Sequence, residues 1–137
     1  MTRYLLVVNF EGGVVETPME EWKPEEITAH LDYYKALHEE LAEAGGELAW
    51  RAGPLQKGAN LCHGTAGNGY AFLALLERTG DELWLTRARA FALHAAGQVE
   101  RSRSEYGRGR YMLWTGDLGT ALYLADCIDG RGGLPLP

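Results

Sequence analysis

The spacing of apolar residues predicts that most of the chain is helical. The first stretch with helical spacing opens at Pro24, a residue favoured at the first position of a helix, and continues with acidic residues that suit the helix dipole. Gly45 and Gly46 predict its end, so we expect a helix near residues 24–44. Its apolar stripe consists of Ile27, Leu31, Tyr34, Leu37 or His38, and Leu41.

Three more helices are expected near residues 68–79, 82–102 and 117–128. The first is apolar nearly all round, which predicts burial on most sides. Gly80 is its expected C-terminal stop, and Asp81 is expected to cap the helix that follows. That next helix places one apolar stripe on a single face: Trp84, Ala88, Phe91, Ala95 and Val99.

One strand is predicted near the start of the chain. Residues 3–10 are apolar at both alternating positions, which is typical of a strand covered on both sides, and Gly12 and Gly13 end the run. A lone strand is not stable by itself. We expect it to pair elsewhere, for example with residues 111–114, or not to pair at all.

Charge is divided unevenly along the 137 residues. Residues 1–49 carry three basic against eleven acidic side chains, a net of −8, and residues 50–137 carry ten against eight, a net of +2. This change predicts a join near residue 49. Neither part is basic enough to indicate binding to nucleic acid.

The sequence contains no apolar run long enough to cross a membrane and no pattern of a secretory signal, so we expect a cytoplasmic protein. Its two cysteines, Cys62 and Cys127, do not form a disulfide framework. In a reducing compartment, a thiol is a metal ligand, a reactive group or a buried apolar side chain.

The candidate chemistry lies in a glycine-rich run over residues 58–76. Cys62 and His63 stand side by side near its centre, and an apolar helix follows. Glycines allow the backbone to pass close to other backbone or to a bound ion. A thiolate and an imidazole are ligands that zinc prefers, so the pair is a candidate metal site.

Residues 50–133 resemble the C-terminal end of the lanthionine synthetase C-like (LanC-like) family. The matching motifs run from Lys57 to Phe72, from Trp84 to Phe91 and from Leu113 to Cys127. The resemblance implies an α/α toroid of helical hairpins. It also implies one zinc ion held by two cysteines and a histidine, which activates a peptide cysteine as thiolate for addition to a dehydrated serine or threonine.

By this resemblance, Cys62 and His63 are two of the three zinc ligands. The family's third ligand is a cysteine farther upstream, as are its acid–base residues, and the upstream part of this sequence contains no cysteine. Cys127 is expected to be buried in the last helix, away from the metal. The sequence therefore predicts a weak or partial zinc site, with the catalytic residues unknown.

Residues 2–48 resemble the start of the YCII-related family, whose members are ferredoxin-like α+β dimers. The stretch that carries the likeness runs from Met19 to Gly45. A helical histidine is the suspected functional residue of that family, and His30 occupies the matching place. The family's further strands, second helix and Asp-Gly-Pro-Phe motif have no counterpart here.

We therefore expect a mainly α chain made of two pieces: a truncated YCII-like β–α segment over residues 1–48, and part of a LanC-like α/α toroid over residues 49–137. Two functions are open. One is a zinc-site fragment related to thioether synthases, inactive alone, with a dehydrated cysteine-containing peptide as its partner. The other is a non-enzymatic helical interaction module, or a non-functional hybrid. Apolar faces left uncovered, including that of residues 69–78, predict self-association.

Overall fold

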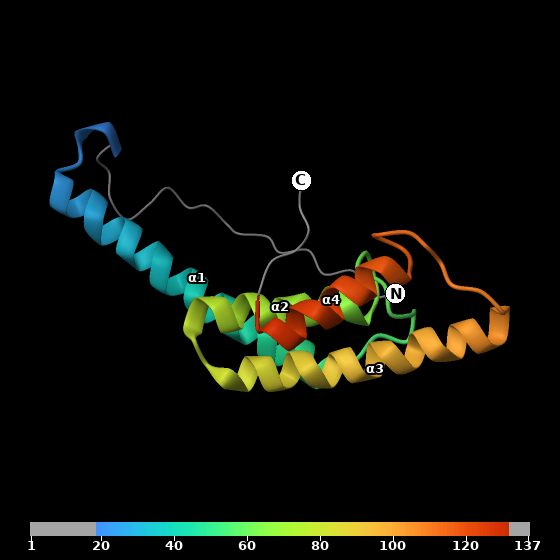
Figure 1. Ribbon diagram of the computed structural model, residues 1–137. Helices are drawn as coiled ribbons and strands as arrows, with labels where there is room; N and C mark the ends of the chain where they lie inside the picture. Colours follow the sequence, from blue (N-terminus) through green and yellow to red (C-terminus); the bar gives the residue numbers. More distant parts are fainter. Residues whose placement is uncertain (1–18, 132–137) are drawn as a thin grey trace. The chain divides into compact units, whose positions relative to one another are not determined.

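A computed structural model describes residues 19–131, and over these residues the protein is helical (Figure 1). No strand occurs between residues 19 and 131, and residues 111–114 form a loop. The expected strand over residues 3–10 lies outside the described residues. The elements are a 3-10 helix, η1 (Met19–Glu21), and four α-helices: α1 (Pro24–Ala52), α2 (Thr65–Thr79), α3 (Glu82–Tyr106) and α4 (Asp117–Asp129).

The helix boundaries between α2 and α3 follow the predicted signals. Gly80 adopts a left-handed conformation with φ of 70°, and its N–H donates to the carbonyl oxygen of Leu76. The Asp81 carboxylate accepts a hydrogen bond from the Leu83 N–H at 2.9 Å, which caps α3. Both predicted roles are confirmed. No helix within residues 19–131 has the length and apolar character that a membrane span requires.

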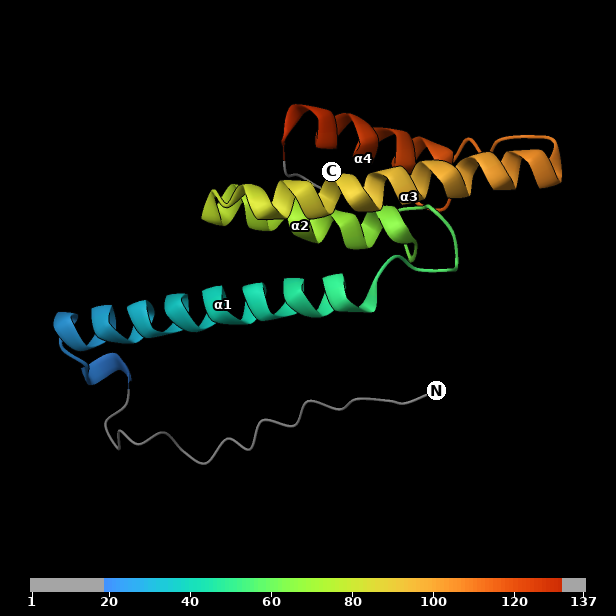
Figure 2. The same cartoon turned by 90° about the horizontal axis from the view of Figure 1, so that it is seen from below.

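The chain divides into two compact units, Met1–Glu39 and Glu40–Pro137, with the division inside α1. In the first unit, η1 precedes the first turns of α1. The second unit contains the rest of α1, the three other helices and the core. In it, α2 packs along α3, and α4 contacts both of them (Figure 2).

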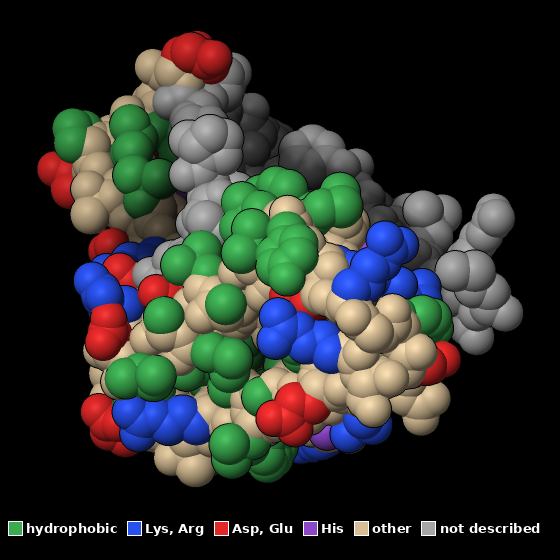
Figure 3. Space-filling model, turned by 45° about the vertical axis from the view of Figure 1, so that its right-hand side comes forward, with side chains coloured by type: hydrophobic (Ala, Val, Ile, Leu, Met, Phe, Trp, Pro, Cys, Tyr) green, Lys and Arg blue, Asp and Glu red, His purple; other side chains and the backbone are tan. Residues whose placement is uncertain are grey.

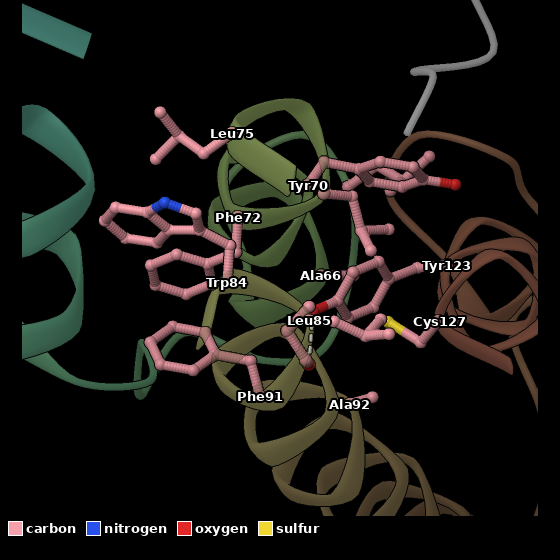
Figure 4. Close-up of a cluster of buried hydrophobic side chains, with 13 residues drawn as sticks. Ala66, Tyr70, Phe72, Leu75, Trp84, Leu85, Phe91, Ala92, Tyr123 and Cys127 are labelled. Carbon is pink, nitrogen blue, oxygen red and sulfur yellow. Dashed lines mark hydrogen bonds between the residues drawn. The ribbon is translucent and has the colours of Figure 1, made fainter. Parts of the chain in front are cut away.

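Aromatic side chains build much of the core of the second unit (Figure 4). The rings of Phe72 and Trp84 lie nearly parallel with centroids 6.1 Å apart, and Phe91 meets Phe72 edge-on at 4.9 Å. Side chains of α2 are fully enclosed here, so the expectation that residues 69–78 would present an uncovered face was wrong. The buried apolar residues of α2 are Ala66, Tyr70, Phe72, Leu73 and Leu75.

The helix α1 does not end at the two glycines but continues to Ala52. Gly46 is buried, and a Cβ placed on it would lie 2.3 Å from Leu75 Cδ1 and 2.9 Å from the Trp84 ring. Gly46 therefore allows α1 to approach α2 and α3 closely. The predicted helix end at residue 44 was wrong because close packing between helices also selects glycine.

Arg87 fixes α1 to α3 within the second unit. It does not belong to the predicted apolar stripe of α3, yet it is buried. Its Nη1 lies 2.6 Å from Glu47 Oε1, and its guanidinium carbon lies 4.7 Å from the Trp84 ring centroid and 5.3 Å from that of Trp50. A guanidinium can be buried in this way because it both pairs with a carboxylate and stacks on aromatic rings.

Candidate metal-binding site

The helices α2 and α4 begin with two loops of the same construction. Residues 61–67 read Leu-Cys-His-Gly-Thr-Ala-Gly, and residues 113–119 read Leu-Trp-Thr-Gly-Asp-Leu-Gly. The glycine before each helix has nearly the same extended backbone: Gly64 has φ −116° and ψ −172°, and Gly116 has φ −131° and ψ −167°. The candidate site therefore lies in one of two copies of a repeated loop-and-helix motif.

Both loops turn back so tightly that only glycine fits at the helix start. The N–H of Thr65 donates to the carbonyl oxygen of Gly58 at 2.9 Å, and the equivalent bond joins Asp117 to Arg110 at 2.7 Å. A Cβ on Gly64 would lie 2.5 Å from the Gly58 oxygen. Such a distance is well inside van der Waals contact, so the backbone crossing excludes any side chain there.

The two loops are joined directly. The N–H of Cys62 donates to the carbonyl oxygen of Trp114 at 2.9 Å, and the Thr120 hydroxyl donates to the Ala59 carbonyl at 3.0 Å. The Leu61 side chain is buried and lies over Gly119, where an added Cβ would come within 2.6 Å of Leu61 Cγ. The loop that carries Cys62 is thus held by the loop before α4.

The side chain of Gln98 on α3 supports the same loop from its other end. Its amide nitrogen donates to the Leu55 carbonyl at 2.7 Å, and its amide oxygen accepts from the Thr65 hydroxyl at 2.7 Å. Thr65 is fully buried. These bonds fix the chain on both sides of the Cys-His pair.

Cys62 and His63 lie on this fixed loop with their side chains exposed. The N–H of His63 donates to Asn60 Oδ1 at 3.1 Å, which holds the turn just ahead of α2. A thiol and an imidazole on adjacent, exposed positions are free to take an external ligand. In kind, this donor set suits zinc.

The two donors, the Cys62 thiol and the His63 imidazole, are too few for a complete zinc site. Within residues 19–131, no group of three or more His, Cys, Asp or Glu side chains could hold a metal ion. A zinc ion with an open position is normally held by three protein ligands. The two residues at the site therefore fit part of the coordination that the sequence led us to expect, and no catalytic step can be derived through a metal held by them alone.

Cys127 does not supply the missing ligand. It is only 2% exposed and lies in the last turns of α4. Cys62 bonds to the loop at the start of that helix, and Cys127 is roughly 16 Å along the helix axis from Gly116. Burial raises the pKa of the Cys127 thiol, with smaller contributions from its neighbours. The expectation that this cysteine would be buried is confirmed.

A polar cleft of about 340 Å³ opens beside the site. It lies between the loop before α2, the last turns of α3 and the loop before α4. Three cationic side chains, Lys57, Arg101 and Arg110, line it. Asn60, which bonds to the His63 N–H, also lines the cleft, whereas Cys62 and His63 do not.

The sequence did not predict this cleft. Lys57 stands in the motif that carries the Cys-His pair, but Arg101 and Arg110 lie in what reads as a polar run between helices. The signal that was present is the excess of arginine over residues 101–110, where four arginines accompany one glutamate. Only the fold shows that residues 101–110 and the loop that contains Lys57 line the same cleft.

His30 belongs to the first unit. Its ring packs edge-on against Trp22, with centroids 4.9 Å apart, and against Tyr34 at 4.7 Å. No hydrogen bond or ion pair from the His30 ring to a carboxylate occurs among the described residues. The geometry is that of a histidine packed among aromatic rings, and its predicted catalytic role gains no support from it.

A family model described as lanthionine synthetase C-like protein matches residues 26–132. The chain therefore belongs to this family, which implies that its helices form part of an α/α toroid. Among the relatives, the zebrafish (Danio rerio) glutathione S-transferase LANCL1 is 40% identical over 90 residues, which are 61% of this chain and 20% of the relative.

A second relative comes from Arabidopsis thaliana. Its LanC-like protein GCL1 is 49% identical over 92 residues, 65% of this chain and 21% of the relative. The chain thus spans about a fifth of the length of these relatives. No solved structure matches the chain.

The family match reaches farther toward the N-terminus than the resemblance seen over residues 50–133. It begins at residue 26, inside the stretch that resembled the YCII-related family, and it includes all of α1 beyond its first two residues. Neither the family model nor these two relatives support a YCII-related part. The LanC-like part of the prediction is confirmed, and the YCII-related part has no support.

Proposed function

We propose that this chain supplies the Cys62–His63 half of a thiol-activating zinc site of the LanC-like type. The observation that carries the proposal is the geometry of the loop. Two backbone hydrogen bonds, from the N–H of Cys62 and the N–H of His63, hold it, and it presents a thiol and an imidazole side by side to solvent. The described residues add no third ligand. Because Cys62 and Cys127 are the two cysteines of the sequence, we propose that a cysteine from another chain completes the site.

Zinc held in this way would lower the pKa of a bound substrate thiol and keep it as the reactive thiolate. The chain's own residues do the positioning. The bond from Cys62 N–H to Trp114 and the bond from His63 N–H to Asn60 fix the backbone of both ligands before any metal binds. Preorganisation of this kind reduces the entropy lost on binding.

The neighbouring cleft suggests the class of thiol. Lys57, Arg101 and Arg110 line it, together with the carboxylates of Glu105 and Asp117. Asp117 already accepts a hydrogen bond from the Arg110 N–H and lies 3.8 Å from Arg103, so the cationic groups predominate. One relative is named a glutathione S-transferase. We propose a small peptide thiol with carboxylate groups, such as glutathione or a cysteine-containing peptide, as the substrate.

Competition for zinc against a chromophoric chelator tests the site. We expect the purified chain to bind zinc weakly and below one equivalent, because two ligands hold the ion less well than three. Cys62→Ala and His63→Ala should each abolish this binding, and Cys127→Ala, the matched control, should leave it unchanged. Tight binding that survives Cys62→Ala would refute the assignment.

A further inference from the structure

Large apolar side chains are exposed where α3 ends and the loop before α4 begins. Tyr106, in the last turn of α3, is 59% exposed, and Tyr111 and Met112 in the loop are 74% and 61% exposed. On the face shown in Figure 3, hydrophobic side chains lie directly beside Lys and Arg side chains. Neighbouring exposed apolar side chains with a polar rim are typical of a surface that binds a ligand.

These side chains surround a pocket of about 470 Å³, which we call the aromatic pocket. It is lined by Tyr106, Arg108, Gly109, Arg110, Tyr111 and Met112. The lining therefore contains two arginines and no acidic side chain, whereas acidic and cationic side chains both line the cleft described above. Neither arginine forms an ion pair with another described residue. The aromatic pocket thus suits a ligand that is both apolar and negatively charged.

Arg110 is held at the place where the aromatic pocket adjoins the cleft. Its N–H donates to Asp117 Oδ2 at 3.0 Å, and its carbonyl oxygen accepts from the Asp117 N–H at 2.7 Å. Its guanidinium carbon lies 5.8 Å from the centroid of the Tyr106 ring. Arg110 and Tyr106 line both the pocket and the cleft. A single ligand can therefore occupy the two together.

The aromatic pocket is also connected to the loop that carries the thiol. The Thr115 hydroxyl donates to Met112 Sδ at 3.7 Å, and the backbone of Met112 passes so close to Gly116 that an added Cβ would lie 2.8 Å from the Met112 oxygen. Two residues after Met112, the carbonyl oxygen of Trp114 accepts the hydrogen bond from the Cys62 N–H. The pocket and the Cys62 loop therefore belong to one hydrogen-bonded structure.

We propose that the aromatic pocket binds the C-terminal residue of a cysteine-containing peptide, and that this residue is apolar. A peptide places a carboxylate directly beside an apolar group when its last residue has an apolar side chain. Arg108 and Arg110 pair with the carboxylate. Tyr106, Tyr111 and Met112 pack against the side chain.

This inference rests on the proposed function, because it names the class of substrate that the same site takes. It separates such a peptide from glutathione, whose C-terminal glycine has no side chain to fill the pocket. The binding itself involves the pocket alone, so it can be measured without zinc.

Titration with short peptides, followed by NMR chemical shifts of the 15.1 kDa chain in reducing buffer, tests the proposal. The probe is N-acetyl-Cys-Gly-Gly-Phe, and the comparison peptides carry Gly in place of Phe or an amide in place of the carboxylate. We expect the Phe peptide to bind roughly two- to tenfold more tightly than the Gly peptide, as is typical of packing between aromatic rings. Tyr111→Ala with Met112→Ala should remove this preference. Arg108→Gln should reduce the advantage of the acid over the amide.

Leu93→Ala serves as the matched control, since Leu93 is a similarly exposed apolar side chain of α3 that lines neither the pocket nor the cleft. It should leave the preference for Phe unchanged. Cys62→Ala should also leave it unchanged while abolishing zinc binding, so failure of the zinc site and failure of the pocket give different results. Equal affinity of the wild type for the Phe and Gly peptides would overturn the proposal. A preference for Phe that survives the loss of both Tyr111 and Met112 would do the same.

Discussion

The backbone N–H of Cys62 donates to the carbonyl oxygen of Trp114 at 2.9 Å, and these two residues occupy the same position in two copies of one loop. The bond joins the start of α2 to the start of α4. It places an exposed Cys-His pair on backbone that is fixed without a metal. The geometry of the candidate site is therefore a property of the repeated fold.

Gly45 and Gly46 offer a matched pair of substitutions with opposite expected effects. Both lie inside α1, but a Cβ on Gly45 meets nothing within 4 Å, whereas one on Gly46 meets Leu75 at 2.3 Å. Gly45→Ala should raise the free energy of unfolding by about 0.5–1 kcal/mol through helix propensity. Gly46→Ala should lower it by about 1–3 kcal/mol through overpacking. Urea denaturation measures both, and equal effects would show that Gly46 does not mark a close helix contact.

The two thiols should differ sharply in reactivity. Cys62 is exposed, whereas Cys127 is buried and burial raises its pKa, so little reactive thiolate is present there at neutral pH. Alkylation of the folded chain should consume one equivalent of reagent quickly and a second only after denaturation. The rapid equivalent should vanish in Cys62→Ala. Two rapid equivalents would contradict the position of α4 in the core.

Stability should fall in alkaline solution because two buried tyrosines resist ionisation. Tyr123 donates to the Ala88 carbonyl at 2.7 Å and Tyr70 donates to Asp126 Oδ2 at 2.6 Å. Burial, followed by the nearby acidic groups, raises the pKa of both side chains above the ordinary value of 10.0. Between the unfolded and the folded pKa, the unfolded chain loses protons that the folded chain keeps.

Above pH 10, and up to its folded pKa, each tyrosine should therefore lower the free energy of unfolding by about 1.4 kcal/mol per pH unit. Below pH 10 both states keep the proton, so the stabilisation by each buried tyrosine is fully present. Tyr123→Phe should weaken the fold at neutral pH, since it loses the bond to Ala88, but flatten the alkaline decline. Tyr106→Phe, at an exposed site, should leave the decline unchanged. A wild-type stability that is constant from pH 9 to pH 11 would contradict the prediction.

Much of the fold follows from local sequence signals. Apolar spacing located all four helices, and Gly80 and Asp81 marked their boundary because caps depend on residues next to one another. The end of α1 was missed because Gly46 allows a close contact with Leu75 and Trp84, which lie 29 and 38 positions later in the chain. The burial of Arg87 could not be predicted, because its carboxylate partner and both stacking rings are known only from the packing of α1 against α3.

The candidate site shows the same division. Cys62 and His63 are recognisable as ligands from their chemistry and their glycine-rich setting. The loop before α4 that anchors them lies 52 positions away, and its role depends on the backbone bond to Trp114, which leaves no mark on residue type. The cleft arises for the same reason, since it brings Lys57 together with Arg101 near the end of α3 and Arg110 after it.

We propose that this chain holds part of a thiol-activating zinc site and is inactive alone. We expect no thioether formation by the purified chain, because a third zinc ligand is missing among residues 19–131. The acid–base residues that the family carries farther upstream have no identified counterpart here, and proton transfer by such a positioned side chain is typically worth about 10²–10⁴-fold in rate. The direct measurement incubates the chain and zinc with a dehydrated cysteine-containing peptide and follows free thiol by mass-tagged alkylation. The account predicts the same thiol loss as with zinc alone; a faster loss that disappears in both Cys62→Ala and His63→Ala would contradict it.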